Sequence, residues 1–464
     1  MRIIHYLFGL PPVREGGLVG YVLDLAGEQI QQGNEIYLLV PGSYKAKAEI
    51  KITKKKWKAF DCFYINNSLP VSGGKSTIEI GALYAEGDAR VYRDFLRRLC
   101  PDIIHIHSFM GLHKTFMQVA NELNITVLFT AHDYYGLCPN ATLFKKDMSI
   151  CNGNWNQCAV CMGQGVAISQ MTKYQSQVYR YLKKNFLYHW MEYSPLLLPL
   201  KRIMKKENKQ KKEIELTDDW IKQVNREYKK LKDYYNQMFG YVNFFHFNSV
   251  QTETVYKQQL GDIRGEVVYI GNKNIRDRRQ IYRYEGKLKI GFIAHNVPNK
   301  GFEMLKSALD EMYVEGMTDI ECHIFNNYNG ETLPYIIRHI PYRNDKIERA
   351  FDLFDVLVLP SLWKETFGLV AFEAISFGKP VIMTENVGAK EIFLGNDIGI
   401  VVKPDKEFLK GKLIEIYNDR SILEKENRKI KMADIKFDYI DHCRKITRLY
   451  EKASVTKEMS GTTD

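Results

Sequence analysis

Residues 360–381 read PSLWKETFGLVAFEAISFGKPV and connect an apolar run to the pattern of an apolar helix. A polar turn follows the run, and the helix pattern begins at Phe367 and Gly368. A strand that leads directly into a helix leaves backbone N–H groups unpaired at the helix start, and these groups favour an anion. Gly378 and Pro380 then end the helix before the next apolar strand. The stretch therefore predicts a strand, a turn that can hold an anionic ligand, a helix and a second strand.

Two glutamates frame this turn. Glu365 lies in the turn, and Glu373 lies eight residues later, about a turn and a half into the helix at about 3.6 residues per turn. Both side chains can therefore face a ligand at the start of the helix. Two glutamates at this spacing also occur by chance in charged proteins, so the assignment depends on the residues around them.

The whole stretch resembles the signature of the retaining glycosyltransferases of family 4. The similarity rests on two glutamates with seven residues between them, on the Phe367–Gly368 pair, and on the Gly–x–Pro–Val exit at 378–381. This resemblance implies an α/β protein of the GT-B fold, in which two Rossmann-like domains face a cleft and close on a nucleotide-sugar. The N-terminal domain would carry a helical insertion.

Length and composition agree with a two-domain protein. A chain of 464 residues is too long for one hydrophobic core and leaves room for an insertion. Hydrophobic residues make up 45% and charged residues 26%, as in ordinary soluble globular proteins. The net charge of +11 indicates an acidic partner. Nucleotide phosphates or an anionic membrane surface are favoured, and no nucleic-acid partner is expected, because no nucleic-acid-binding module is recognisable.

The sequence also bears on the compartment. No run approaches the roughly 20 apolar residues that a membrane-spanning helix needs. Eight cysteines in a chain of this length do not form a disulfide framework, which favours a reducing compartment. We expect a cytoplasmic protein that can lie peripherally at the inner face of the cell membrane.

Strand and helix patterns alternate along the N-terminal half. Strands are expected at 1–9, 35–40 and 125–130, and helices at 19–32 and 84–99. This alternation predicts a doubly wound parallel sheet. Ligands bind such sheets at the carboxyl ends of the strands.

Gly16 and Gly17 lie between the first expected strand and its helix. Glycines at this place let the backbone approach a phosphate or a sugar, with the helix dipole assisting. Family 4 enzymes also show a glycine pair here, and in them it faces the interdomain cleft. A plain turn is the alternative.

Polar side chains follow two later strands, namely His107 and Ser108 after one and His132 after the other. The string FTAHDYYGLCP is similar to the T-x-HDY-x-x-x-CP stretch of family 4 members that build bacterial surface polysaccharides. In the wider family this histidine approaches the donor sugar and the reaction centre, so the resemblance gives His132 a positioning or proton-handling role. A buried structural histidine is the alternative. The acceptor would enter near His107 to Gly111.

Four of the eight cysteines, Cys138, Cys151, Cys158 and Cys161, lie within 24 residues in a Gly/Asn-rich loop. Four thiolates could organise such a loop around a structural zinc ion. An iron–sulfur cluster or four free thiols are the alternatives, and no catalytic role is implied.

The alternation breaks in the segment that follows, which has long helical patterns rich in Tyr and Lys. One apolar stripe is expected to pack onto the neighbouring domain: Ile221, Val224, Tyr228, Leu231, Tyr235 and Met238. An apolar patch at 196–200 precedes a basic run. This combination suits an anionic membrane surface or, equally, a solvated loop.

The C-terminal half opens with a new strand near Lys287 and a helix that begins at Lys300–Gly301. Family members usually read G-F-x-G-R-x-x-x-x-K-G here, with the Arg and Lys holding the donor diphosphate. Ala294 and His295 stand where Gly and Arg are expected, and Lys300 matches the Lys. An imidazole supplies less charge than a guanidinium and no bidentate contact, so donor binding by His295 is expected to be weaker.

These segments predict the domain order. We expect an acceptor-side domain at 1–261 with its insertion at about 163–240, a linker at 262–285 and a nucleotide-sugar-binding domain at 286–435. The remaining residues, 436–464, would form a helix that crosses back to the first domain and a tail.

The resemblance also assigns roles at the expected donor site. Glu373 would bind the ribose hydroxyls, and Glu365 would contact the transferred sugar. Backbone amides at Phe367 and Gly368 would receive the diphosphate together with Lys300, His295 and the Gly16–Gly17 loop. Tyr342 would lie near the nucleotide base. No metal ion or other cofactor would be required for catalysis.

The expected function is transfer of a sugar from a UDP- or GDP-sugar to a glycan or a lipid-linked acceptor with retention of configuration, in polysaccharide biosynthesis. The GT-B scaffold also serves nucleotide-sugar epimerases and phosphorylases. A catalytically weak homologue that acts as a binding partner is a further alternative, because of His295.

Overall fold

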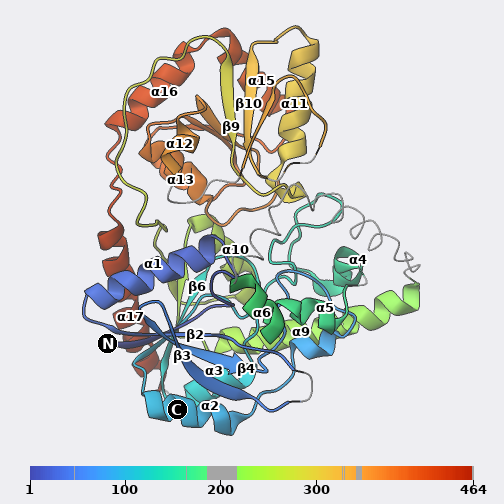
Figure 1. The fold of residues 1–464 in the computed structure, drawn as a ribbon, viewed down its shortest axis with the longest axis vertical. Helices are drawn as coiled ribbons and strands as arrows, with labels where there is room; N and C mark the ends of the chain where they lie inside the picture. Colours follow the sequence, from blue (N-terminus) through green and yellow to red (C-terminus); the bar gives the residue numbers. More distant parts are fainter. Residues whose placement is uncertain are drawn as a thin grey trace.

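The computed structural model describes residues 1–45, 48–163, 165–184, 217–326, 328, 330–340 and 347–461. These residues form two α/β domains, which lie one above the other in Figure 1. Within the described part of the chain, no helix is both long enough and apolar enough to cross a membrane. The prediction of a GT-B fold, with two parallel-sheet domains, is confirmed.

The first domain is built on an eight-stranded sheet with the order β3-β4-β2-β1-β5-β6-β7-β8. All neighbours pair in parallel except the β3–β4 hairpin. The strands are β1 (Arg2–Tyr6), β2 (Glu35–Pro41), β3 (Lys51–Trp57), β4 (Phe60–Asn66), β5 (Ile103–Ile106), β6 (Thr126–Ala131), β7 (Phe244–Phe247) and β8 (Gly265–Val267). Because β8 pairs with β7, the first sheet extends into the expected linker at 262–285.

Helices cover both faces of this sheet. The longer ones are α1 (Gly17–Gln31), α2 (Ala89–Leu99), α3 (Lys114–Glu122), α9 (Asp218–Gly240) and α10 (Val250–Leu260). Helix α2 starts later than the expected residue 84, because the Asp88 carboxylate caps it by accepting a hydrogen bond from Arg90 N at 2.9 Å. The predicted stripe on α9 is buried in the first-domain core at Tyr228, Leu231, Tyr235 and Met238.

Shorter helices follow β6 in the loop region of the first domain. They are α4 (Cys158–Met162), α5 (Ile168–Met171), the 3₁₀ turn η3 (Thr172–Gln175) and α6 (Gln177–Lys184). The turn η3 is fixed to the loop after β4, because Gln175 Oε1 accepts a hydrogen bond from Val71 N at 2.9 Å.

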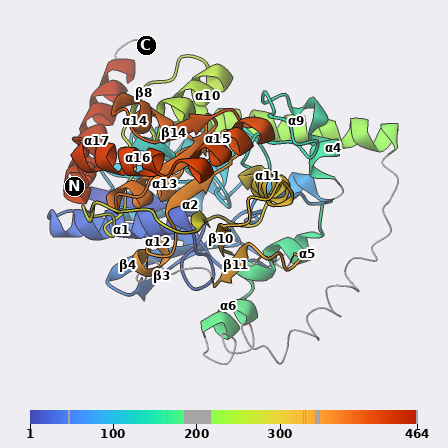
Figure 2. The ribbon, with the colours of Figure 1, turned by 90° about the horizontal axis from the view of Figure 1, so that it is seen from above.

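The last helix, α17 (Tyr439–Gly461), packs on the first domain beside α1 (Figure 1). Its buried residues Cys443, Ile446, Leu449 and Tyr450 share a core with α1 and β1. Helix α17 is therefore part of the first domain's core. Figure 2 shows this helix from above, near α1.

The second domain has a six-stranded parallel sheet with the order β11-β10-β9-β12-β13-β14. The strands are β9 (Leu288–Phe292), β10 (Ile320–Phe325), β11 (Ile336–His339), β12 (Val356–Leu359), β13 (Val381–Thr384) and β14 (Ile400–Val402). The helices are α11 (Phe302–Val314), α12 (Ile347–Phe351), α13 (Leu369–Ser376), α14 (Lys390–Gly395), α15 (Lys406–Asn418) and α16 (Ser421–Met432). The opening stretch of sequence forms β12, α13 and β13.

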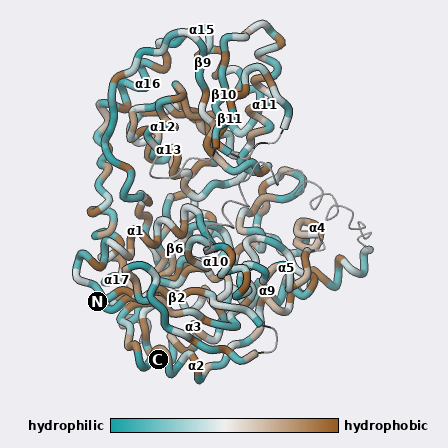
Figure 3. The backbone as a smooth tube through the Cα atoms, in the orientation of Figure 1, coloured by the Kyte–Doolittle hydropathy of each residue, from teal (hydrophilic) through white to brown (hydrophobic). Residues whose placement is uncertain are grey.

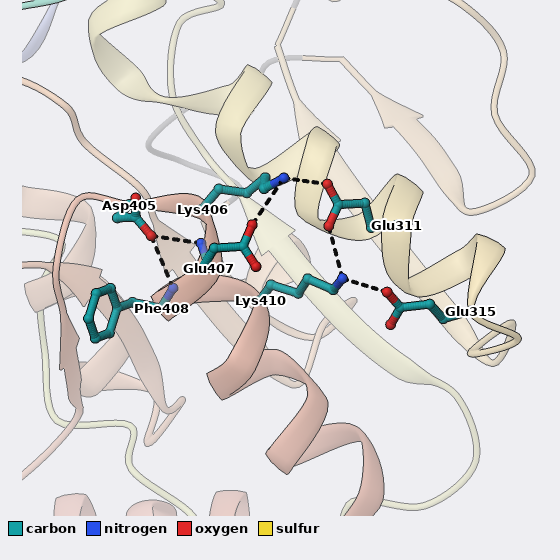
Figure 4. Close-up of polar contacts among 7 residues, drawn as sticks. All are labelled: Glu311, Glu315, Asp405, Lys406, Glu407, Phe408 and Lys410. Carbon is teal, nitrogen blue, oxygen red and sulfur yellow. Dashed lines mark hydrogen bonds and ion pairs between the residues drawn. The ribbon is translucent and has the colours of Figure 1, made fainter.

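Apolar residues concentrate on the central strands of both domains (Figure 3). On the outer face of the second domain, ion pairs connect α15 to α11 (Figure 4). Lys410 Nζ lies 2.9 Å from Glu311 and 2.6 Å from Glu315, and Lys406 also contacts Glu311. Asp405 caps α15 by accepting a hydrogen bond from Glu407 N at 2.8 Å. Such exposed pairs contribute little individually, about 0–1 kcal/mol.

Candidate active site

The turn between β12 and α13 holds an ion pair. Lys300 Nζ lies 2.5 Å from Glu365 Oε1, and Ser361 Oγ donates a hydrogen bond to the other carboxylate oxygen. The Lys300 ammonium also lies 5.2 Å from the centre of the Trp363 ring. The structure therefore brings together the lysine and the glutamate that the sequence placed at the donor site.

Two glycines allow this turn its close contacts. Gly301, which follows Lys300, has a φ of +72°, and a Cβ atom there would lie 1.8 Å from Pro360 O. Gly368, which precedes α13, has a φ of +86°, and a Cβ atom there would lie 2.6 Å from Val387 Cγ1. Any larger residue at either position would move the turn and the ion pair it holds.

The first domain fixes the same turn from the other side. Gln251 Nε2, at the start of α10, donates hydrogen bonds to Glu365 O at 2.9 Å and to Asn386 O at 2.8 Å. Thr366 Oγ1 donates a hydrogen bond to His132 O at 2.8 Å. His132 and Glu365, which are far apart in sequence, are thus neighbours across the domain interface.

A cleft of about 1400 Å³ lies between the domains. Gly16 and Gly17 line it from the first domain, and His295 and Glu373 line it from the second. A Cβ atom at either glycine would meet nothing within 4 Å, so both backbones are open toward the cleft. His295 is exposed, so its ring is accessible to a ligand in the cleft. Lys300 and Glu365 are not among the residues that line this cleft and lie beside it.

Glu373 is buried in the floor of the cleft on α13. Its Oε1 accepts a hydrogen bond from Asn272 Nδ2 at 3.2 Å. Phe367, which is also buried, packs on Tyr269 with ring centroids 6.1 Å apart. Glu373 and Phe367 are thus held by residues that connect the two domains.

His132 begins a chain of hydrogen bonds that runs into the first domain. Its Nε2 lies 3.0 Å from His107 Nδ1, and His107 Nε2 lies 3.0 Å from His5 Nδ1. His5 Nε2 lies 2.8 Å from Gln29 Oε1. Gln29 Nε2 donates a hydrogen bond to Tyr450 OH on α17 at 2.9 Å.

The chain continues through the sheet to a backbone carbonyl. Tyr450 OH lies 2.9 Å from His105 Nδ1, and His105 Nε2 lies 2.6 Å from Thr130 Oγ1. Thr130 Oγ1 lies 2.9 Å from His246 Nδ1, and His246 Nε2 lies 2.7 Å from Val268 O. Apart from the final carbonyl, every member of the chain is a side chain.

The donor and acceptor of each hydrogen bond in this chain follow from its last member, the carbonyl oxygen of Val268. Burial lowers the pKa of His5 and His246 to about 4 and that of His132 to about 3, so these rings are neutral at pH 7. A neutral imidazole has one donor and one acceptor nitrogen. Val268 O can only accept, so His246 Nε2 carries a proton, and each earlier member then donates toward Val268. His132 is left with its proton on Nε2 and with Nδ1 as an acceptor.

The ligand atoms of His5, His105 and His107 lie within 4.8 Å of one another, a spacing that could hold a metal ion. Both ring nitrogens of each histidine already take part in the chain of hydrogen bonds. The cluster is therefore satisfied by hydrogen bonding alone.

The loop after β5, expected on the acceptor side, is internally bonded. His107 and Ser108 are buried, and Ser108 Oγ accepts a hydrogen bond from Met110 N at 3.2 Å. Gly111 has a φ of +83°, and a Cβ atom there would lie 2.9 Å from Val71 Cγ2. In this conformation the side chains of His107 and Ser108 are buried, and His107 supports His132 through a hydrogen bond.

None of the four clustered cysteines forms a disulfide. Cys138 Sγ donates a hydrogen bond to Asn140 Oδ1 at 2.9 Å, and Asn140 Nδ2 lies 3.9 Å from Cys161 Sγ. Burial and the neighbouring thiols raise the pKa of Cys138 to about 11. Within the described ranges, no three of these sulfurs lie within 4.8 Å of one another. Zinc binding by Cys138, Cys151, Cys158 and Cys161 stays a prediction.

Two further predictions fall on residues outside the described ranges: Tyr342 near the nucleotide base and the apolar–basic segment at 196–206. Sequence reasoning also missed several residues of the site. Ser361 lay inside the opening stretch, four residues before Glu365, and could have been found as its hydrogen-bond donor. Asn272 and Gln251 carry no local signal, because their partners are more than 100 residues away.

Known proteins resemble this chain over both domains. A family model described as "Glycosyltransferase Family 4" matches residues 15–189, and one described as "Glycosyl transferases group 1" matches residues 273–435. An uncharacterized glycosyltransferase of Methanocaldococcus jannaschii is 26% identical over 198 residues, which cover 41% of this chain and 54% of that protein. The match therefore spans about half the length of that relative.

Several solved structures share the fold at low identity. Sucrose-phosphate synthase from Thermosynechococcus elongatus matches 97% of this chain and 98% of its own at 12% identity, with a TM-score of 0.56. HepE from Anabaena, in complex with UDP and glucose, matches 97% of this chain and 99% of its own at 13% identity, with a TM-score of 0.55. WaaG, a glycosyltransferase involved in lipopolysaccharide biosynthesis, is 14% identical with a TM-score of 0.54, over 97% of this chain and 99% of its own.

The two facing domains and the cleft between them define the class of this protein, a glycosyltransferase of the GT-B type. Its N-terminal half resembles the family 4 model over residues 15–189, and its C-terminal half resembles the group 1 model over residues 273–435, so both domains match glycosyltransferase models.

Proposed function

We propose that this chain transfers a hexose from a UDP- or GDP-sugar to an acceptor hydroxyl with retention of configuration. The observation that carries the proposal is the convergence on one cleft of Gly16, Gly17, His295 and Glu373, with the Lys300–Glu365 pair beside it. Two structures of this fold contain UDP, which supports a nucleotide-sugar donor.

The donor would lie across the cleft with its diphosphate at the start of α13. Lys300, His295 and the backbone amide of Gly17 would face the phosphates, and Glu373 would accept hydrogen bonds from the ribose hydroxyls. Glu365 would bind hydroxyls of the transferred sugar. Asn272 donates a hydrogen bond to Glu373 Oε1 at 3.2 Å and so helps to orient the carboxylate in the cleft.

The chemical step breaks the bond between C1 of the sugar and the β-phosphate oxygen, and the electron pair stays on the nucleotide diphosphate. The acceptor oxygen forms the new bond to C1, and its proton passes to the departing phosphate oxygen. Lys300 and the amides at α13 would stabilise the charge that develops there, without a need for a metal ion. His132 Nδ1, as a fixed acceptor, would hold a donor-sugar hydroxyl.

A role in polysaccharide biosynthesis, with a glycan or lipid-linked acceptor, is the biological setting that we propose. It rests on the resemblance of the FTAHDYYGLCP stretch and on the net charge of +11, which suits an anionic membrane surface or acidic substrate.

Calorimetry with UDP-glucose, GDP-mannose and related sugar nucleotides tests donor binding. We expect at least one of them to bind, and Glu373→Gln to weaken it about tenfold by removing charge-assisted hydrogen bonds to the ribose. Glu415→Gln, on the outer helix α15, is the matched control and leaves the affinity unchanged. The proposal fails if no sugar nucleotide binds the wild-type chain.

A further inference from the structure

Arg14 is a partly buried arginine in the loop between β1 and α1. Its guanidinium makes one hydrogen bond, from Nη2 to Val71 O at 3.3 Å, and within the described residues it has no carboxylate partner. A guanidinium has five N–H donors and stays charged at physiological pH. A charge that is partly removed from water normally needs a counter-charge. A bound anion would therefore stabilise the Arg14 guanidinium.

The surrounding backbone leaves space for this side chain. A Cβ atom at Gly9, which has a φ of +153°, would lie 2.5 Å from Arg14 Cγ. At Gly73, with a φ of +57°, a Cβ atom would lie 3.6 Å from Arg14 Nη1. The Arg14 guanidinium also lies 5.0 Å from the centre of the Tyr174 ring. Stacking of this kind holds a guanidinium in place and leaves its N–H groups directed outward.

Arg180 on α6 is a second arginine whose guanidinium stacks on a tyrosine ring. Its guanidinium lies 4.9 Å from the centre of the Tyr64 ring, and among the described residues its side chain has neither a hydrogen bond nor an ion pair. The Tyr174 ring, on which Arg14 stacks, meets the Tyr179 ring edge to face with centroids 4.9 Å apart. Tyr179 directly precedes Arg180 in the sequence. Within the described part of the chain, Arg14 and Arg180 are thus cations that stack on tyrosine rings without a carboxylate partner, and such a cation favours an oxyanion.

The position of Arg14 relative to the cleft indicates which substrate it binds. Pro11, Glu15 and Gly16, on either side of Arg14, line the interdomain cleft. Val71, whose carbonyl accepts from Arg14, packs against the Gly111 loop at the end of β5. Arg14 itself does not line the cleft but lies directly behind these residues on the first-domain side, whereas His295, to which we assign the donor diphosphate, lines the cleft from the second domain.

We propose that Arg14 binds an anionic group of the acceptor, so that the acceptor is a phosphorylated molecule and not a neutral glycan. This inference rests on the proposed transfer and narrows its acceptor. A phosphate monoester suits the planar fork of an arginine, which forms two parallel hydrogen bonds to it. The phosphate can belong to a soluble sugar phosphate or to a lipid headgroup.

The test titrates the full chain with glucose 6-phosphate, glucose and inorganic phosphate, with and without UDP to separate the two sides of the cleft. We expect glucose 6-phosphate to bind at least tenfold more tightly than glucose. Arg14→Gln should weaken the binding of glucose 6-phosphate at least tenfold. Arg14→Lys should cause an intermediate loss of affinity, because it keeps the charge but loses the two parallel N–H donors of the guanidinium. Arg90→Gln, an exposed arginine on α2, is the matched control.

Flotation with vesicles that contain phosphatidic acid separates the two sources of phosphate. Flotation that depends on Arg14 identifies a lipid headgroup, and binding of glucose 6-phosphate alone identifies a soluble acceptor. Equal binding of glucose 6-phosphate by wild type and Arg14→Gln overturns the inference, as does the absence of any phosphate binding. Failure of UDP and GDP to bind the wild type would instead contradict the proposed donor, and Arg14→Lys keeps the test valid if Arg14→Gln does not fold.

Discussion

His132 and His107 are joined by a hydrogen bond of 3.0 Å between Nε2 of the first ring and Nδ1 of the second. Through His5 and Gln29, this bond connects the candidate active site to Tyr450 on the last helix. Because every donor along the chain points the same way, Tyr450 helps to decide which nitrogen of His132 carries the proton. The C-terminal helix thus contributes to the site as well as to the core.

Replacing Tyr450 by Phe should disturb that proton order. The change leaves Gln29 Nε2 and His105 Nδ1 without their buried partner, which costs about 1–3 kcal/mol of stability. It also removes the constraint on the His132 tautomer. We expect ¹⁵N NMR of labelled histidines to show a mixture of His132 tautomers, and the transfer rate to fall several-fold. Tyr313→Phe, whose hydroxyl makes no hydrogen bond within the described residues, should change neither; an unaltered tautomer in Tyr450→Phe would refute the positioning role.

Restoring an arginine at position 295 should strengthen donor binding. His295 is exposed and lines the cleft where the expected diphosphate contact would lie. A guanidinium adds a full charge and a bidentate contact, which we expect to tighten UDP binding about tenfold, or about 1.4 kcal/mol. Asn296→Arg adds the same charge one residue away and serves as the control. Equal effects of the two variants would show that general attraction, and not the contact at 295, is responsible.

Buried neutral histidines should make the fold sensitive to acid. Burial lowers the pKa of five histidines from 6.5 to about 3–4: His5, His113, His132, His246 and His442. Between these values and 6.5 the unfolded chain binds protons that the folded chain does not, so stability is full above about pH 6.5 and falls as the pH decreases.

Each such histidine is expected to cost on the order of 2 kcal/mol at pH 5 relative to pH 7.5. Urea unfolding at pH 8.5, 7.5, 6.5 and 5.5 measures this. The free energy of unfolding should be nearly level between the first two values and decrease steeply below 6.5. A level profile down to pH 5.5 would mean that these histidines keep their ordinary pKa in the folded protein.

Metal analysis tests the prediction for the cysteine cluster. If Cys138, Cys151, Cys158 and Cys161 ligate one zinc ion, protein purified without chelator carries about one equivalent per chain. Cys158→Ser should then lower both the zinc content and the melting temperature. Metal-free wild-type protein with four titratable thiols in this loop would identify them as free cysteines, in agreement with their spacing in the structure.

Sequence patterns were sufficient for the features that depend on local order. The β12–α13 turn, the glycine pair before α1 and the lysine before α11 all lie where the motifs placed them, because each motif forms its own strand, turn and helix. The family resemblance assigned Lys300 and Glu365 to one donor site, and the structure shows them in an ion pair at 2.5 Å, which the resemblance did not predict.

Features that depend on distant partners could not be predicted. Gln29 and Tyr450 are 421 residues apart, and neither is unusual in its own segment. Arg14 looks like any loop arginine until the fold shows that its neighbours are glycines and a tyrosine in place of carboxylates. His5 and His105 lie in β1 and β5, and His107 follows β5; the alignment of the three rings requires the register between the two strands.

The central claim is that this chain cleaves a nucleotide-sugar and that Glu365 takes part. Release of UDP or GDP from the sugar nucleotide that binds most tightly, followed by chromatography, measures this most directly. We expect steady release by the wild type, faster release with an acceptor, and a loss of at least a hundredfold in Glu365→Gln with Glu415→Gln unchanged. Release that is equal in Glu365→Gln and wild type, or binding of the sugar nucleotide with no release by the wild type, would contradict the claim.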